Sequence, residues 1–170
     1  MTTKDFSIKW LAYGLALLPV WFAQAFLVNR LPFFGVIPSL LPLAAVTVAV
    51  LEGASAGAGF GLLVGVLFDT LETGSAGWMT LALTLVGLCA GLLAQYVLRQ
   101  DLLGCLVCSA LALAAIDAGR VLARLLTGRA ELSAMAAVAG REIVWSLCFV
   151  PIVYLLFRWV FRRVPKATVL

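Results

Sequence analysis

Charged side chains whose spacing could support chemistry gather in the second half of the chain. Asp117, Arg120 and Arg124 stand at positions i, i+3 and i+7, so they share one face of a helix. Arg141 and Glu142 begin a later apolar run, and carboxylates brought together in this way can act as general acid and base. Guanidinium groups beside them would keep both carboxylates ionised, which favours an ionic cluster over acid–base catalysis.

The four cysteines and the absence of histidine bear on metal and redox chemistry. Cys105 and Cys108 form a CxxC pair, but it lies within an apolar run and no second pair completes a ligand set. We interpret the cysteines as small buried side chains. There is also no nucleophile beside a base and no phosphate-binding loop. The sequence therefore predicts no catalytic residues, no metal and no cofactor, and a protein that is not an enzyme.

Composition places these residues in a membrane. Of the 170 residues, 64% are hydrophobic and 12% are charged, and the mean hydropathy is +1.13. Soluble domains carry roughly 45–50% apolar and about 25% charged residues. We therefore predict an all-α, polytopic membrane protein with room for about six transmembrane helices. The net charge of +4 comes from basic residues at segment ends, which indicates orientation in the lipid bilayer and no binding to nucleic acid.

The apolar runs divide the chain into six segments of a single integral-membrane domain, residues 1–170. The second and third segments are short for a bilayer, so they either cross a locally thinned region or form a re-entrant hairpin. With six crossings, seven lysines and arginines lie on the inner side and three to five on the outer side. This bias predicts cytoplasmic termini. The segments are expected at residues 10–28, 37–51, 54–69, 78–98, 102–126 and 138–161.

A row of glycines runs along the third segment. Gly53, Gly57, Gly61 and Gly65 are spaced four apart, which places them on one slowly drifting face of a helix. In lipid, helices associate through close backbone approach, which small residues permit. We expect this glycine edge to pack against another helix. Packing within one subunit and an interface with a partner chain are both open alternatives.

The predicted topology brings several charges to the outer surface of the membrane. Charges in that layer are costly unless they are paired, and they are a functional-site hypothesis by default. We expect an outer ionic cluster that locks the third, fifth and sixth segments together, or that receives a helix end or an extracellular domain of a partner. Its predicted members are Asp69, Asp117, Arg120, Arg141 and Glu142, with Arg124 and Glu72 on the rim.

Residues 52–95 combine a Gly-Phe pair, a further glycine, a Leu-rich run that ends in Asp, a short turn, and a glycine before a long apolar helix. This pattern resembles the rod shape-determining protein MreD family of bacteria. One departure is Glu52, at a place where the family often has a basic residue. The residues that carry the resemblance are Gly59, Phe60, Gly65, Asp69 and Gly77, together with Pro38 and Pro42 at the start of the second segment.

The resemblance implies a non-enzymatic scaffold in the bacterial inner membrane that serves lateral cell-wall elongation and rod shape. The implied partners are an MreC-like single-span protein with a periplasmic domain and, around it, the actin-like MreB filament and the RodA glycosyltransferase complex. The resemblance also implies a fold similar to that of the substrate-binding subunits of energy-coupling-factor vitamin transporters.

A substrate-binding subunit of a small-molecule transporter is the alternative function. Ala12 and Ala16 form a small-xxx-small pair of the type that docks a transmembrane partner, and Trp78 and Asp117 could line a ligand pocket. A channel or proton-coupled carrier is disfavoured, because Asp69 and Asp117 are expected near the membrane boundary and not at its midplane. Retention of a vitamin-like ligand by the purified protein would favour the transporter.

Overall fold

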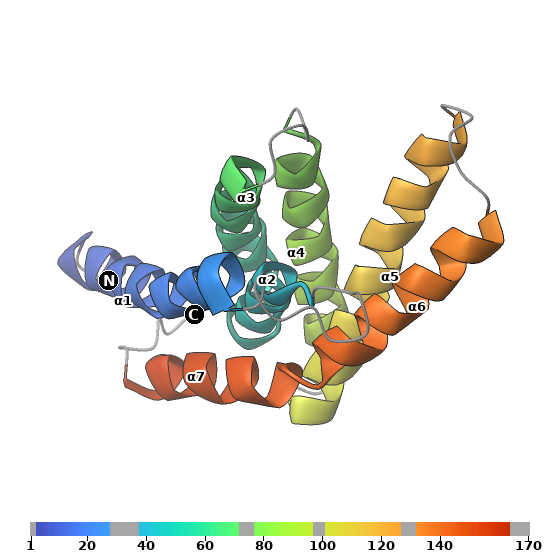
Figure 1. The fold of residues 1–170 in the computed structure, drawn as a ribbon. Helices are drawn as coiled ribbons and strands as arrows, with labels where there is room; N and C mark the ends of the chain where they lie inside the picture. The colour runs from blue at the N-terminus through green and yellow to red at the C-terminus, as the bar shows by residue number, and fades with distance from the viewer. Residues whose placement is uncertain (1–2, 28–37, 72–76, 97–100, 127–131, 164–170) are drawn as a thin grey trace.

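The computed structural model describes residues 3–27, 38–71, 77–96, 101–126 and 132–163, and every regular element in these ranges is a helix (Figure 1). The prediction of an all-helical fold is confirmed. The elements are α1 (Thr3–Phe22), the π-helical segment η1 (Ala23–Leu27), α2 (Leu40–Glu52), α3 (Ala54–Leu71), α4 (Trp78–Tyr96), α5 (Leu102–Leu126), α6 (Leu132–Leu147) and α7 (Val150–Arg163).

The short helix α2 lies at the centre of the fold. All residues from Leu40 to Leu51 are buried, and α2 packs against α3, α4, α5 and α7. A helix that is apolar on every side is stable only when other elements surround it. Its 13 residues span about 20 Å, against about 30 Å for the hydrocarbon core of a bilayer. The polar groups at both ends of α2 therefore need partners inside the protein.

A sharp turn at Gly53 connects α2 to α3. The φ angle of Gly53 is 97°, a conformation that glycine adopts without the strain that a side chain would cause. Its N–H donates to the carbonyl oxygen of Ala49 at 2.9 Å, which closes α2. Gly53 was predicted as the first member of the glycine edge. It lies in the turn before α3, and it also lies against α4, because a Cβ atom added at Gly91 would come within 2.7 Å of its carbonyl carbon.

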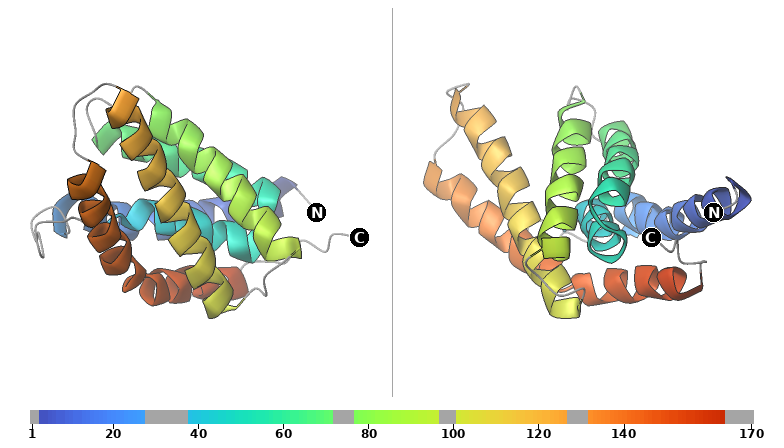
Figure 2. Two further views of the ribbon diagram at one scale, coloured as in Figure 1. Left: turned by 90° about the vertical axis from the view of Figure 1, so that its right-hand side faces the viewer. Right: turned by 180° about the vertical axis from the view of Figure 1, so that it is seen from behind.

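The helices α5 and α6 form a hairpin that leans away from α3 and α4 at the end where α5 finishes (Figures 1 and 2). The beginning of α5 is fixed on α2, where the buried Cys105 Sγ lies 3.6 Å from the hydroxyl of Thr47. Cys108, one turn further along, has its Sγ 4.0 Å from the carbonyl oxygen of Ala90 on α4. In the far half of α5, Ile116 is buried in the core, and Asp117 and Arg120 make the polar contacts described below.

The last predicted segment, residues 138–161, is not one continuous helix. It is divided between α6 and α7, which meet at a bend of 44°. Pro151 accounts for the break, because proline has no N–H to donate and is tolerated in the first turn of a helix but not in its interior. The predicted sixth segment therefore covers two helices, α6 and α7.

Two of the described helical stretches are long and apolar enough to cross a membrane alone, Trp78–Tyr96 and Leu102–Leu122. The bent pair of α6 and α7 makes a third if it is counted as one span. Leu40–Glu52 and Ala54–Thr70 are apolar but shorter. The number of six crossings stays a prediction.

Candidate functional site

Gly57, Gly61 and Gly65 of α3 face the backbone of α4 with no side chain between the two helices. A Cβ atom added at Gly57 would lie 2.5 Å from the carbonyl oxygen of Gly87. One added at Gly61 would meet the carbonyl oxygen of Leu83 well inside 3.0 Å, and one at Gly65 would meet the α4 backbone as closely. Real Cβ atoms essentially never come this close, so only glycine allows α3 and α4 to approach in this way.

The helix α4 contributes glycines of its own to this contact. A Cβ atom at Gly87 would meet the carbonyl group of Gly57, and one at Gly91 would meet the backbone of Ala54. Small residues on both helices bring the backbones together and increase dispersion contact, which is a main source of helix association in lipid. Because α4 covers the glycine edge, the geometry supports packing within one subunit.

Arg120 of α5 joins three helices at one end of the fold. Its Nη1 lies 3.5 Å from Asp117 Oδ1 on the same helix and 3.5 Å from Glu142 Oε1 on α6. Its guanidinium group also lies over the ring of Phe68 on α3, 5.8 Å from the ring centroid. The three segments that the sequence analysis expected to be locked together therefore meet at this side chain.

Side chains from other helices cap the N-terminus of α2. The N–H of Leu40 donates to Oε1 of Gln24 in η1 at 2.7 Å, and the N–H of Ser39 donates to Oγ of Ser146 in α6 at 3.0 Å. The Ser39 hydroxyl donates to Oε1 of Glu142 at 2.7 Å. These bonds satisfy N–H groups that the helix itself leaves unpaired. The sequence analysis missed Gln24, Ser39 and Ser146, although serine before an apolar run is a typical helix-start signal.

Three predicted members of the outer ionic cluster, Asp117, Arg120 and Glu142, meet. Asp69 accepts hydrogen bonds from the N–H of Thr80 at 3.2 Å and from its hydroxyl at 2.5 Å, and so caps the start of α4. Arg141 is exposed, and its Nε donates to the carbonyl oxygen of Ala137 in its own helix at 3.3 Å. Two side chains lie outside those that the structure describes: Arg124 and Glu72. We call Ser39, Asp117, Arg120 and Glu142 the outer polar cluster, after the predicted topology.

An ion pair that the sequence analysis missed joins α1 to the other end of α2. The Nζ of Lys9 pairs with Oε2 of Glu52, and the two side chains are only 12% and 11% exposed. The hydroxyl of Tyr13 donates to the other Glu52 oxygen at 2.7 Å. We call Lys9 and Glu52 the inner pair, after the predicted topology. Lys9 and Tyr13 stand one helical turn apart, but nothing in the sequence indicated a partner 43 residues away from Lys9.

Three buried aromatic rings pack beside the inner pair. Tyr13 stacks on Phe157 of α7 with 6.2 Å between ring centroids and 15° between planes. Phe60 of α3 meets both rings edge-on, at 6.2 Å from Tyr13 and 5.8 Å from Phe157. Such pairs stabilise a core beyond the area that they bury. The rings hold α1, α3 and α7 together at the end of the fold opposite the outer polar cluster.

An apolar groove of about 590 Å³ opens between α1 and α3. At Gly14 an added Cβ atom would have nothing within 4 Å. The Nε1 of Trp21 is buried and has no hydrogen-bond partner in the part of the chain that the structure describes. The lining residues are Gly14, Leu17, Leu18 and Trp21 of α1 and Leu62, Leu63, Val66 and Leu67 of α3.

Three carboxylates among the described residues connect helices to one another. Glu52 connects α1 to α2, and Glu142 connects α6 to both α2 and α5. Asp69 connects α3 to α4. Carboxylates that accept hydrogen bonds or pair with a cation are held in place by their partners. What this arrangement can do is position helix faces, in particular the two walls of the apolar groove.

Comparison with known proteins identifies the family. A family model described as rod shape-determining protein MreD matches residues 4–160, which is nearly the whole chain. No curated protein and no solved structure matches the chain significantly. The expected likeness to substrate-binding subunits of energy-coupling-factor transporters therefore stays a prediction.

Proposed function

We propose that this chain, which belongs to the MreD family, is a non-enzymatic integral-membrane scaffold of the bacterial cell-elongation machinery and helps to determine rod shape. The family match over residues 4–160 is the observation that carries the proposal. The partners are a single-span protein such as MreC and, with it, the RodA-type glycosyltransferase complex. The scaffold lies in the inner membrane, and lysine and arginine bias favours cytoplasmic termini.

The apolar groove is the surface that we assign to the single-span partner. The glycine edge is covered by α4, so it offers no free face to another chain. In the groove, Gly14 leaves open space, and Leu18, Leu62 and Leu63 expose about half of their surface. A bare glycine beside exposed leucines suits a transmembrane helix, since close packing is what makes helices associate in lipid.

The lining of the groove also bears on the transporter alternative. Its volume of about 590 Å³ is within the range of small-molecule pockets, roughly 300–1,000 Å³. Such pockets orient their ligand with a few convergent polar groups, however, whereas this groove is lined almost wholly by apolar atoms. The groove therefore fits an apolar helix better than a vitamin-like ligand, which favours the scaffold.

Cell shape tests the proposed function. In the bacterium that encodes this chain, the genomic copy is depleted and a second copy of the gene is supplied. A wild-type second copy should maintain rod-shaped cells. Gly14→Leu should reach the membrane at the wild-type level yet leave the cells round, because leucine fills the groove where Gly14 has no neighbour within 4 Å. The measurement is cell width by microscopy, with membrane content by immunoblot.

Gly140→Leu is the matched control, because Gly140 of α6 also has nothing within 4 Å but lies outside the groove. It should maintain rods. Depleted cells that keep their rod shape without the chain would refute the proposed function. If cells with Gly14→Leu stay rod-shaped, the groove is not the binding site of the partner, but the proposed function is not refuted.

A further inference from the structure

Three arginines crowd the last turns of α7 without a carboxylate partner in the described part of the chain. Arg158, Arg162 and Arg163 are all exposed. The ion pairs of the described residues lie on α1, α2, α5 and α6, and none of them includes α7. The end of α7 therefore carries a local excess of positive charge.

Aromatic rings hold two of these guanidinium groups. Arg163 lies 3.9 Å from the ring centroid of Trp159, and Arg158 lies 5.6 Å from that of Tyr154. A guanidinium group over a ring face is attracted by the ring, while its N–H donors point outward in its own plane. These donors form the fork geometry that binds phosphate oxygens in pairs. The rings thus leave the hydrogen-bonding edges of the arginines available.

An apolar stripe on α7 leads to the arginines. Ile152, Leu155 and Trp159 are 63%, 60% and 55% exposed, at i, i+3 and i+7 on one face of the helix. The opposite face is buried against the rest of the protein. The apolar side chains match the acyl chains of a phospholipid, and the exposed cations match its anionic headgroup. Tryptophan is enriched at the membrane–water interface, where these two parts meet.

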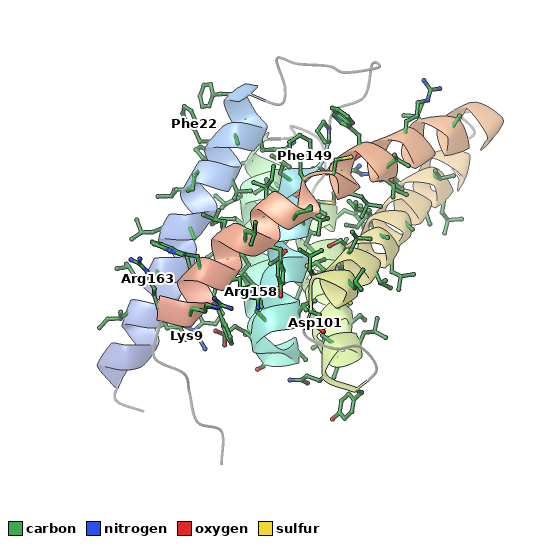
Figure 3. All side chains as sticks on the ribbon, turned by 90° about the horizontal axis from the view of Figure 1, so that it is seen from below. Lys9, Phe22, Asp101, Phe149, Arg158 and Arg163 are labelled. Carbon is green, nitrogen blue, oxygen red and sulfur yellow. The ribbon has the colours of Figure 1, made fainter. Side chains whose placement is uncertain are left out.

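Among the described side chains, the neighbouring charges do not neutralise this site. Figure 3 shows Lys9 near Arg158 and Arg163, where α1 and α7 lie side by side. Lys9 is paired with Glu52, so this pair adds no net charge. Asp101 lies further away, at the start of α5 (Figure 3). The field at the end of α7 therefore remains positive.

We propose that Arg158, Arg162 and Arg163 bind the phosphate of an anionic phospholipid headgroup, while an acyl chain lies along Ile152 and Leu155. This site is independent of the groove and of the proposed partner. Two other effects could place arginines here. Membrane orientation favours basic residues on the cytoplasmic side, and the helix dipole favours them in the last turn of a helix. Neither explanation predicts that a particular lipid stays bound to the purified protein.

Native mass spectrometry of the full chain, released from nanodiscs of equal parts phosphatidylcholine and phosphatidylglycerol, tests the proposal. The wild-type chain should retain phosphatidylglycerol preferentially. Arg158→Gln and Arg162→Gln should each lower that preference about fivefold, the size expected for one basic residue near an anionic surface. The triple variant with Arg163→Gln should abolish it. The single variants carry the test if the triple variant does not fold.

Arg141→Gln is the control, because Arg141 is also exposed but lies on α6, where its Nε donates to the carbonyl oxygen of Ala137. It should retain phosphatidylglycerol as the wild-type chain does. Millimolar inorganic phosphate should not displace the lipid, and displacement would overturn the assignment to a lipid headgroup. Equal retention of both lipids by the wild-type chain, or an equal loss in Arg141→Gln, would also overturn it.

Discussion

Gly61→Leu is expected to separate α3 from α4 and to lower the stability of the protein by roughly 3 kcal/mol, the upper end of the usual cost of overpacking. The large effect follows from what the new side chain would meet. The first added carbon already meets the carbonyl group of Leu83, and backbone cannot rotate away as a side chain can. Thermal unfolding in detergent should show a fall of the order of 10 °C in Tm.

The size of this effect depends on the position and not on the substitution. Gly140→Leu makes the same change in α6, where an added Cβ has nothing within 4 Å, and should leave Tm nearly unchanged. Gly61→Ala should also destabilise the protein, because a single methyl group meets the same carbonyl. If Gly61→Leu unfolds at the temperature of the control, α3 and α4 do not pack along the glycine edge.

Arg120→Leu is expected to lower the free energy of unfolding by about 2 kcal/mol, because it weakens the contacts of the outer polar cluster. Removal of the guanidinium group leaves Asp117 and Glu142 facing each other without a cation, and unpaired charges in a partly buried site are costly. Arg120 is 27% exposed, so solvent weakens the effect relative to a fully buried pair. The contact with Phe68 on α3 is lost as well. The unfolding midpoint in detergent measures the loss.

Two variants test whether this loss comes from the ion pairs. Arg141→Leu removes an exposed arginine whose Nε bonds to Ala137 in its own helix, and should lower the free energy of unfolding by less than about 0.5 kcal/mol. Asp117→Asn in the Arg120→Leu background should recover part of the loss, because one of the two unpaired charges is gone. If Arg120→Leu and Arg141→Leu are equally stable, the outer polar cluster does not hold the helices together.

Hydropathy and residue spacing were enough to predict the fold class and most of the helix positions. The spacing of Gly57, Gly61 and Gly65 by four identified a close helix contact, because a helix repeats its faces at nearly that interval. The identity of the opposite helix could not be read from α3 alone. Gly87 and Gly91 of α4 carry the same spacing and were a signal that the sequence analysis did not use.

The charged sites show where reasoning from the sequence ends. Asp117 and Arg120 are one helical turn apart, so their pairing follows from local geometry. The contacts of Glu142 with Ser39, and of Glu52 with Lys9, depend on how distant helices cross, which no local pattern encodes. The contact of Asp69 with Thr80, which caps α4, likewise depends on how α3 lies against α4.

The outer polar cluster and the inner pair lie at the two ends of α2, which explains why so apolar a chain contains these charges. Because α2 is too short for the bilayer, its N-terminus needs the caps from η1 and α6, and its C-terminus ends at the Glu52 carboxylate, which Lys9 neutralises. The two polar sites fix the orientation of the helices around α2. In this account they keep α1 and α3 at the separation that leaves the apolar groove open.

The central claim is that this chain works by helix contact at the apolar groove, and photo-crosslinking in intact membranes tests it most directly. A photoreactive side chain placed at Leu18 or at Leu63 faces the groove, whereas one at Leu85 is 61% exposed on α4, outside it. The account predicts an adduct with a single-span membrane protein from both groove positions and none from Leu85. Adducts of equal yield from all three positions, or only adducts between copies of the chain itself, would contradict it.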